Sequence, residues 1–290
     1  MEEPLVSIVM STYNRAHLLE EAVESIKSQT YKNWMLVLVD DCSKDTTKVV
    51  MAKLAAEDKR ILRVFNSHNM GSIESKRRHM LEARGKYLAV LDDDDKWTPY
   101  YLRIMVEALE ANPDKYGVYC NALIGINNKV IHWISSKGRP FPNILPSTML
   151  WKSDKYKEFG GWDPWLKYYH AEGDLWIRAN GREKFIGIPT QLVTIGYQED
   201  NMSKNKLKSA IGLIQILRKH KKNVPDLAGF YLRIGVHMAE SNRKYLKWLY
   251  SSFKVKPSIE VLGGILLTWF LGRKGFLRTY KLWRKLNGYV

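Results

Sequence analysis

Residues 86–99 read KYLAVLDDDDKWTP, an apolar run that ends in four consecutive aspartates. The apolar run predicts a buried β-strand, and Pro99 predicts the start of a helix. Two unit charges about 4 Å apart repel by roughly 1 kcal/mol even in bulk water, so four adjacent carboxylates need a compensating charge. Hard carboxylate oxygens suit Mg²⁺ or Mn²⁺, which one or two carboxylates hold together with substrate phosphates. The alternative is a polar loop whose last aspartate, Asp95, caps the following helix.

Strands and helices alternate on both sides of this stretch. Short apolar runs predict strands, whereas apolar residues at helical spacing predict helices. The predicted strands are 5–11, 34–40, 61–67, 86–92 and 116–126, and the helices between them are 15–29, 46–57, 72–84 and 99–112. This alternation predicts an α/β fold, with a mostly parallel central sheet that helices cover on both faces. From about residue 127 the alternation breaks, and 204–250 is predicted to be helical.

Polar side chains follow the first predicted strand. The cluster STYNR (11–15) supplies hydroxyls, an aromatic ring and a cation through Ser11, Thr12, Tyr13 and Arg15. A nucleotide uses such groups, because its base stacks on an aromatic face and its phosphates accept hydrogen bonds from arginine. The alternative is that Asn14 only caps the helix that follows.

A second acidic turn, VDDCSKDTT (39–47), follows the second predicted strand. Asp40 and Asp41 could accept hydrogen bonds from a base or a ribose. The alternative is a cap on the next helix, a role that suits Asp45. Because the carboxyl ends of parallel strands meet at one edge of a sheet, the three polar clusters are expected where open α/β folds bind ligands.

The net charge of +16 is unevenly distributed over the 290 residues. Residues 203–290 contain 19 Lys and Arg against 3 Asp and Glu, whereas residues 1–202 are neutral. This asymmetry predicts an anionic partner, either nucleic acid or a lipid surface. Two cysteines, Cys42 and Cys120, are too few for a disulfide framework and indicate a reducing compartment. The N-terminal MEEPLVSIVMSTYNR is unlike a signal peptide.

Four motifs, in this order, resemble the family 2 glycosyltransferases of the GT-A fold. They are PLVSIVMSTYNR, VDDCSKDTT, NMGSIESKRRHMLEARGKYLAVLDDDDKWTP and GGWDPWLKYYHAEGDLWIR. The resemblance spans roughly residues 4–202. It implies a catalytic domain over 1–202, with a nucleotide-binding half (1–126) and an acceptor-side half (127–202). A basic, helical region over 203–290 would follow this domain.

The resemblance also assigns a donor site. The nucleotide of a sugar donor would contact the first two motifs, at Ser11, Thr12, Tyr13, Arg15, Asp40 and Asp41. A basic residue of the third motif, Lys76 or Arg77, would lie near the base or the phosphates. The aspartate run matches the family's DXD motif, which implies that Asp93 contacts the ribose and Asp94 binds Mn²⁺ or Mg²⁺, with Asp92 in support.

The family's general base precedes a helix that here reads HAEGDLWIR (170–178). Alignment on DLWIR places the catalytic acid on Glu172, with Ala171 where the family has another Glu. Asp174 is the alternative base, or it caps the helix or orients the acceptor. Many relatives also carry a metal-binding His downstream, and GYQEDNMS (196–203) lacks one, so that Glu199, Asp200 or Asn201 could substitute.

The resemblance implies an inverting, metal-dependent enzyme that moves a sugar from a UDP- or GDP-sugar to a hydroxyl. Polysaccharide, glycolipid and glycoprotein glycan synthesis all fit such an activity. Loss of the strict ED pair leaves open a non-catalytic nucleotide-binding or membrane-scaffold protein on the same fold. A phosphotransferase with an aspartate nucleophile is a more distant alternative. Aromatic side chains of the acceptor-side half could stack on sugar rings or form core: Trp151, Trp162, Trp165, Tyr168 and Tyr169.

The C-terminal region carries an apolar stretch, IEVLGGILLTWFLG (259–272), that is too short for the roughly twenty residues of a membrane-spanning helix. The following RKGFLRTYKLWRKL (273–286) mixes aromatic and apolar side chains with cations, as in a helix that lies on anionic lipid. We expect a cytoplasmic protein, peripheral on the inner face of the cell membrane, with a possible lipid-linked acceptor. The alternative is a helical hairpin packed on the catalytic domain. No recognised nucleic-acid motif accompanies the charge, so no nucleic-acid partner is expected.

Overall fold

The computed structural model describes residues 3–126, 129–134, 145–166, 170–196, 205–221, 224, 227–257 and 259–286. The chain divides into two compact units. The first comprises Met1–Lys167 and Ala171–Glu199, and the second comprises Tyr168–His170 and Asp200–Val290. All three polar clusters of the sequence belong to the first unit.

Four parallel strands form the first half of the sheet in unit 1. They are β1 (Val6–Thr12), β2 (Trp34–Asp40), β3 (Ile61–Phe65) and β4 (Tyr87–Val90), in the order β3-β2-β1-β4. All seven residues of β1 are buried, because neighbouring strands and helices on both faces enclose it. This burial explains why the strand reads as a continuous apolar run instead of an alternating one. The register pairs Thr12 with Asp40, so the two strands end together.

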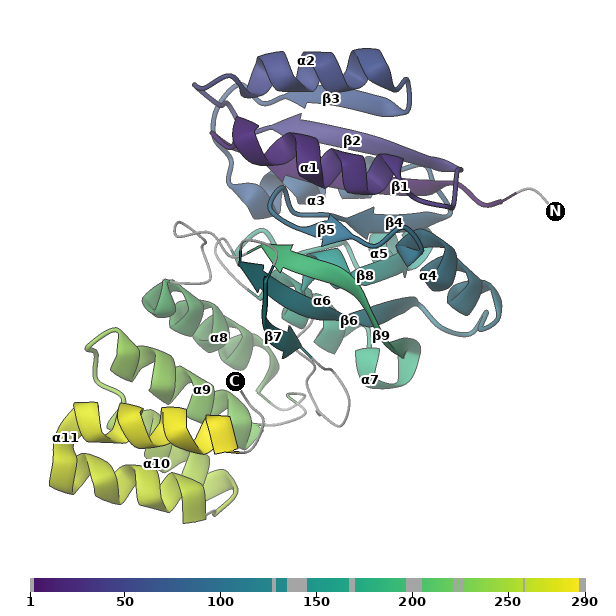
Figure 1. The fold of residues 1–290 in the computed structure, drawn as a ribbon. Helices are drawn as coiled ribbons and strands as arrows, with labels where there is room; N and C mark the ends of the chain where they lie inside the picture. The colour runs from purple at the N-terminus through teal and green to yellow at the C-terminus, as the bar shows by residue number, and fades with distance from the viewer. Residues whose placement is uncertain are drawn as a thin grey trace. The chain divides into compact units, whose positions relative to one another are not determined.

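Three helices cover this part of the sheet: α1 (Ala16–Lys27), α2 (Thr47–Glu57) and α3 (Ser72–Glu82). Helix α4 (Tyr101–Glu110) packs instead against β6 (Gly117–Ile126) and β9 (Phe185–Gly196) of the second half. Figure 1 shows α1 in front of β1 and β2, and α3 behind them. Right-handed crossovers require this arrangement, because the chain reverses its direction across the sheet between β3 and β4. The prediction of alternating strands and helices is confirmed over this part of the chain.

The second half of the sheet is mixed. It contains β5 (Lys96–Trp97), β6 (Gly117–Ile126), β7 (Lys129–Ile134), β8 (Met149–Lys152) and β9 (Phe185–Gly196). Strand β8 runs antiparallel between β4 and β6, whereas β6 and β9 are parallel. The sheet is therefore mixed rather than mostly parallel, because its second half also includes the antiparallel pairs β5–β9 and β6–β7.

Short helical segments connect the strands of this half. They are a 3₁₀ turn at Pro146–Thr148, α5 (Ser153–Glu158), α6 (Ala171–Arg178) and α7 (Gly181–Lys184). The core between sheet and helices is aliphatic and aromatic, and Trp97 stacks on Tyr101 with 4.1 Å between ring centroids. The helix α6 carries the predicted general base and belongs to unit 1.

Unit 2 is helical, as predicted for 204–250. Its helices are α8 (Lys206–His220), α9 (Leu227–Glu240), α10 (Leu246–Val255) and α11 (Ile259–Leu286). Gly272 has a φ of 64° and breaks α11 into two helices, at the boundary between the two C-terminal segments that the sequence distinguishes. Within the described residues, no helix combines the length and the apolar character that crossing a membrane requires.

Candidate active site

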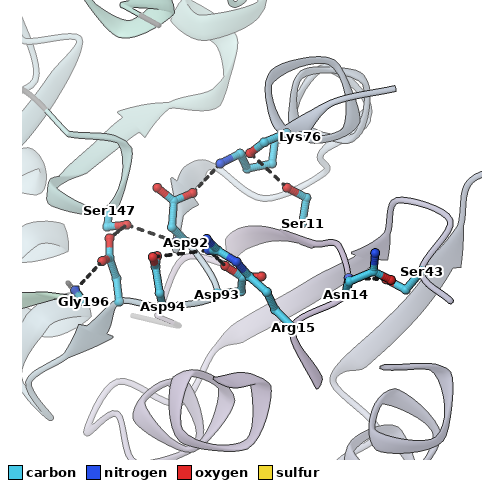
Figure 2. Close-up of polar contacts among 12 residues, drawn as sticks. Ser11, Asn14, Arg15, Ser43, Lys76, Asp92, Asp93, Asp94, Ser147 and Gly196 are labelled. Carbon is cyan, nitrogen blue, oxygen red and sulfur yellow. Dashed lines mark hydrogen bonds and ion pairs between the residues drawn. The ribbon is translucent and has the colours of Figure 1, made fainter. Parts of the chain in front are cut away.

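The four aspartates follow β4 directly, at the carboxyl edge of the parallel strands. Figure 2 shows Asp92, Asp93 and Asp94 beside Arg15 from the end of β1 and Lys76 from α3. The backbone N–H of Asp92 donates to Ser147 Oγ at 3.0 Å, which fixes the start of the run. The sheet topology thus brings together residues that lie up to 79 positions apart in the chain.

Two cations pair with these carboxylates. Lys76 is buried and forms an ion pair with Asp92 Oδ1. Arg15 Nη1 lies 3.0 Å from Asp93 Oδ1 and 3.3 Å from Asp94 Oδ2. Burial by itself lowers the pKa of Lys76, but the adjacent Asp92 carboxylate raises it above the ordinary value. Lys76 therefore stays charged and offsets part of the clustered negative charge.

Burial makes the remaining carboxylates reluctant to ionise. Burial raises the pKa of Asp93, and the Arg15 guanidinium opposes this rise. Burial and the neighbouring Asp92 and Asp93 raise the pKa of Asp94 to about 7. An additional positive charge at Asp94 would lower this pKa, because an adjacent cation favours the ionised form.

The fourth aspartate has a different role from the one predicted. Asp95 accepts hydrogen bonds from Ser147 Oγ and from the backbone N–H of Gly196, the latter at 3.0 Å. Helix α4 begins six residues later, at Tyr101, so the prediction that Asp95 caps it is wrong. Burial raises the pKa of Asp95 well above its ordinary value. Asp95 holds the aspartate run against β9 and the turn before β8.

Sequence reasoning missed Ser147 and Gly196. A Cβ atom at Gly196 would lie 2.0 Å from the carbonyl oxygen of Asp94, so glycine is required for this close approach. Ser147 accepts from the backbone of Asp92 and donates to Asp95. Neither residue belongs to a recognisable local pattern, because both contacts join segments that are distant in sequence.

The turn after β1 is fixed to the turn after β2. Asn14 has a φ of 54°, its N–H donates to Ser43 Oγ at 2.8 Å, and its Oδ1 accepts from Lys44 N at 2.7 Å. Asn14 therefore joins two loops, and the prediction that it caps α1 is wrong. Asp45 supports the starts of α1 and α2, because it accepts hydrogen bonds from the backbone N–H of Ala16 and of Thr47.

The other predicted residues of this turn lie at the same edge of the sheet. Tyr13 is 41% exposed, so its ring is accessible for stacking. Ser11 and Thr12 are buried at the end of β1, and Ser11 Oγ lies 3.4 Å from Ser72 Oγ at the start of α3.

Asp40 and Asp41 are both buried. Asp40 Oδ1 accepts from the Ser43 N–H at 2.9 Å. The Asp41 carboxylate accepts four hydrogen bonds, from Asn66 Nδ2, Met70 N, Gly71 N and Ser75 Oγ. It thus ties the loop after β3 to the start of α3. Both carboxylates position loops in this structure, and their contact with a nucleotide base stays a prediction.

Glu172 lies in the first turn of α6, next to a small and mostly apolar cavity. Met80, Leu88, Met149 and Trp162 are among the side chains that line the cavity with it. Burial raises the pKa of Glu172 to about 7, although the nearby Lys76 opposes this rise. A carboxyl group that titrates near neutrality is suited to accept a proton from a hydroxyl.

Asp174 is engaged in a structural network. Its side chain is fully buried, and its Oδ2 accepts from Arg178 Nε at 2.8 Å. Arg178 also donates to the backbone carbonyls of Phe159 and Gly161. The Asp174–Arg178 pair therefore joins α6 to the glycine turn after α5, which favours Glu172 over Asp174 as the proton acceptor.

Arg77 forms no ion pair with the aspartate run in the part of the chain that the structure describes, and the aromatic residues of the acceptor-side half differ in exposure. Arg77 Nε donates to the backbone carbonyl of Trp162 at 2.7 Å. Arg77 therefore fixes the turn after α5 rather than pairing with the aspartates. Trp151 and Trp162 are buried in the core, whereas Trp165 is 79% exposed. Tyr168, Tyr169 and the alternative metal ligands Glu199, Asp200 and Asn201 lie outside the described residues.

The aspartate run fits a divalent cation that is shared with a bound ligand. Its oxygens are hard donors, and Asp94 sits where added positive charge would relieve repulsion. The part of the chain that the structure describes contains no group of three or more His, Cys, Asp or Glu arranged to hold a metal ion. Mg²⁺-type sites commonly take one or two carboxylates and complete their shell with waters and substrate phosphates.

Comparison with known proteins decides the family. The glycosyl transferase family 2 profile matches residues 7–166, more than half of the chain. The chain belongs to glycosyl transferase family 2. The matched range contains the three polar clusters and ends just before α6.

Two curated relatives show the extent of the similarity. The chain is 31% identical over 131 residues to UDP-Glc:alpha-D-GlcNAc-diphosphoundecaprenol beta-1,3-glucosyltransferase WfgD of Escherichia coli, covering 45% of this chain and 51% of that protein. It is 24% identical to the GalNAc(5)-diNAcBac-PP-undecaprenol beta-1,3-glucosyltransferase of Campylobacter jejuni, covering 89% and 91%. Three other curated relatives match over only 13% to 38% of their own length, whereas the putative glycosyltransferase EpsE of Bacillus subtilis matches over 94% of its length at 29% identity.

A solved structure confirms the fold of this family 2 chain. The mannosyltransferase PcManGT from Pyrobaculum calidifontis, in complex with GDP-Man and Mn²⁺, matches with a TM-score of 0.65 and 16% identity. The match covers 98% of this chain and 88% of that one. The predicted α/β GT-A fold with a helical C-terminal extension is confirmed.

Proposed function

We propose that this chain transfers a sugar from a nucleoside diphosphate donor to a hydroxyl group of a glycan acceptor. The observation that carries the proposal is the position of Lys76, which pairs with Asp92 and lies close enough to Glu172 to influence its pKa. Through Lys76, the aspartate run and the candidate base belong to one site. Unit 1 would hold all the catalytic residues.

Glu172 is the general base of the proposed reaction. The acceptor hydroxyl would lose its proton to a Glu172 carboxylate oxygen while its own oxygen attacks the anomeric carbon. The bond from that carbon to the donor diphosphate would break in the same displacement, so attack and departure lie on opposite faces and the configuration inverts. Burial keeps the pKa of Glu172 at about 7, so that the group can accept a proton and release it near neutral pH.

The donor site uses the residues at the carboxyl edge of the sheet. Asp93 would contact the ribose, Tyr13 would stack on the base, and Arg15 would donate to the diphosphate. Asp94, supported by Asp92, would hold Mn²⁺ or Mg²⁺. When bound, such a cation stabilises the charge that grows on the leaving diphosphate. The GDP-Man and Mn²⁺ of the PcManGT complex support this assignment.

A glycan linked to a lipid diphosphate is the proposed acceptor. The names of the WfgD and Campylobacter jejuni relatives both specify a sugar carried on a diphosphoundecaprenol lipid. Trp165 is an exposed aromatic surface in the acceptor-side half, where a sugar ring could stack. A panel of UDP- and GDP-sugars, with Mn²⁺ or with a chelator, tests the proposal through release of the nucleoside diphosphate. Release from no donor in the presence of metal and a lipid-linked glycan would contradict it.

Unit 2 offers a surface for an anionic membrane, on which such an acceptor would lie. On α10, Leu246 and Tyr250 are 42% and 55% exposed, and the lysines Lys247 and Lys254 beside them are also exposed. Within the segment 273–286, Phe276 is buried in the core of unit 2 and is not available to lipid. Leu277 and Tyr280 also pack against that core, whereas Leu282 of the same helix is 57% exposed. We assign the proposed contact to the exposed side chains of α10, with Leu282 of α11 as a further apolar contact.

A further inference from the structure

Arg15 contacts the carboxylates that a metal ion would use. One guanidinium nitrogen, Nη1, lies 3.0 Å from Asp93 Oδ1 and 3.3 Å from Asp94 Oδ2. The three side chains are between 7% and 19% exposed, so water screens their interaction weakly. Figure 2 shows the guanidinium reaching across to both carboxylates from the end of β1.

The backbone on both sides of Arg15 is held in place. The preceding Asn14 donates to Ser43 Oγ at 2.8 Å, and the following Ala16 donates to Asp45 Oδ2 at 3.1 Å. The Arg15 carbonyl accepts from Leu18 N at 3.0 Å in the first turn of α1. The backbone around Arg15 is therefore fixed by hydrogen bonds to the loops at the sheet edge and within the first turn of α1.

The contact of Arg15 with Asp93 and Asp94 affects how a metal ion can bind there. Lys76 pairs with Asp92, and among the described residues Arg15 is the cation that contacts both Asp93 and Asp94. A divalent cation on Asp94 would compete with Arg15 for the same carboxylate and would lie beside a like charge. A bound diphosphate would favour the metal ion in this competition. Its oxygens accept hydrogen bonds from the Arg15 guanidinium and add negative charge to the site.

We infer that Arg15 is an internal counter-ion that makes divalent-cation binding at Asp94 depend on the donor diphosphate. The inference rests on the proposed metal role of Asp94. Without nucleotide, Arg15 occupies the carboxylates and opposes the metal ion. With nucleotide, the guanidinium turns to the phosphates and leaves Asp94 to the metal ion. Metal and donor then bind cooperatively, and each raises the affinity of the other by the same factor.

The test is isothermal titration calorimetry of Mn²⁺ into the full chain, with and without UDP or GDP. It is done at one fixed pH for all variants, so that protons compete equally in each titration. In the wild type, the nucleotide should tighten Mn²⁺ binding by a factor within the roughly 5- to 150-fold range of coupled sites. Arg15→Gln should tighten Mn²⁺ binding in the absence of nucleotide, by a factor of about 5 or more, and should reduce the coupling.

Two control variants separate charge from shape. Arg15→Lys keeps the positive charge, so its Mn²⁺ affinity without nucleotide should stay close to that of the wild type. Arg63→Gln removes the same charge from an exposed position on β3 and should leave both affinities unchanged. Equal or weaker Mn²⁺ binding by Arg15→Gln, with circular dichroism showing a folded protein, would overturn the inference. Absence of Mn²⁺ binding by the wild type even with nucleotide would overturn the proposed metal role as well.

Discussion

Replacement of Glu172 by glutamine should stabilise the folded protein at alkaline pH. Glu172 is half-buried beside a mostly apolar cavity, so ionisation of its carboxyl is unfavourable in the folded state. Glutamine has nearly the same shape and carries no charge. The ionised Glu172 carboxylate is thus expected to lower the free energy of unfolding. The Glu172→Gln variant, which should abolish transfer, is expected to be more stable than the wild type.

The magnitude follows from the pKa of this carboxyl. Folding raises the pKa of Glu172 from 4.5 to about 7. Because the folded-state pKa is the higher one, the folded state binds more protons between these values, and stability falls as pH rises from 4.5 to 7. At about 1.4 kcal/mol for each pKa unit, the full loss is about 3 kcal/mol above pH 7. Lys76 loses a favourable neighbour in the variant, so the net gain of Glu172→Gln should be about 1–3 kcal/mol at pH 8.

Urea unfolding, followed by circular dichroism without metal or nucleotide, measures this gain. The difference in free energy of unfolding between Glu172→Gln and wild type should be largest at pH 8 and should approach zero near pH 4.5. Glu158→Gln is the matched control, because Glu158 is exposed and pairs only with Lys155 among the contacts described, so a change within about 0.5 kcal/mol is expected. A Glu172→Gln variant that is less stable than wild type at pH 8, or a gain independent of pH, would refute the reasoning.

Three further predictions concern neighbouring parts of the molecule. Asp174→Asn should destabilise the fold by about 3 kcal/mol in urea unfolding, because Arg178 loses a buried partner, and an unchanged unfolding midpoint would count against this structural role. Asp94→Asn should weaken Mn²⁺-dependent nucleotide binding about tenfold or more in calorimetry, and unaltered affinity with metal would argue against Asp94 as its ligand. Joint replacement of Leu246 and Tyr250 by serine should reduce co-sedimentation with phosphatidylglycerol vesicles, whereas Leu62→Ser at an exposed position on β3 should not, and equal sedimentation of both variants would exclude α10 as the membrane contact.

Local patterns predicted the parallel half of the sheet correctly. Each of its strands is a short apolar run and each helix has its own apolar spacing, so the elements could be identified without knowledge of the partners. The second half is less predictable, because β5 and β8 are short and are defined by pairing with distant segments, although the apolar run over 185–197 predicts β9 (Phe185–Gly196). The mixed sheet order follows from that pairing and has no local signature.

In the candidate site, too, local sequence predicted where residues lie but not what they contact. The strand-end position of Asp92–Asp95 was predictable, because polar residues after a buried strand lie at the edge of the sheet. The roles within the run were not, because Asp95 bonds to Ser147 and Gly196 through the fold. The choice between Glu172 and Asp174 also depended on tertiary contacts, since the sequence spacing fits both. Arg178 engages Asp174, and the apolar cavity lies beside Glu172.

The central claim is that Glu172 accepts the proton of the acceptor hydroxyl. The most direct measurement compares wild type, Glu172→Gln and Glu158→Gln for release of nucleoside diphosphate from the active donor, alongside calorimetric affinity for that nucleotide with Mn²⁺. We predict that Glu172→Gln binds the nucleotide as tightly as wild type and loses transfer by about 100-fold or more, while Glu158→Gln retains both. Transfer by Glu172→Gln at the wild-type rate would contradict the claim.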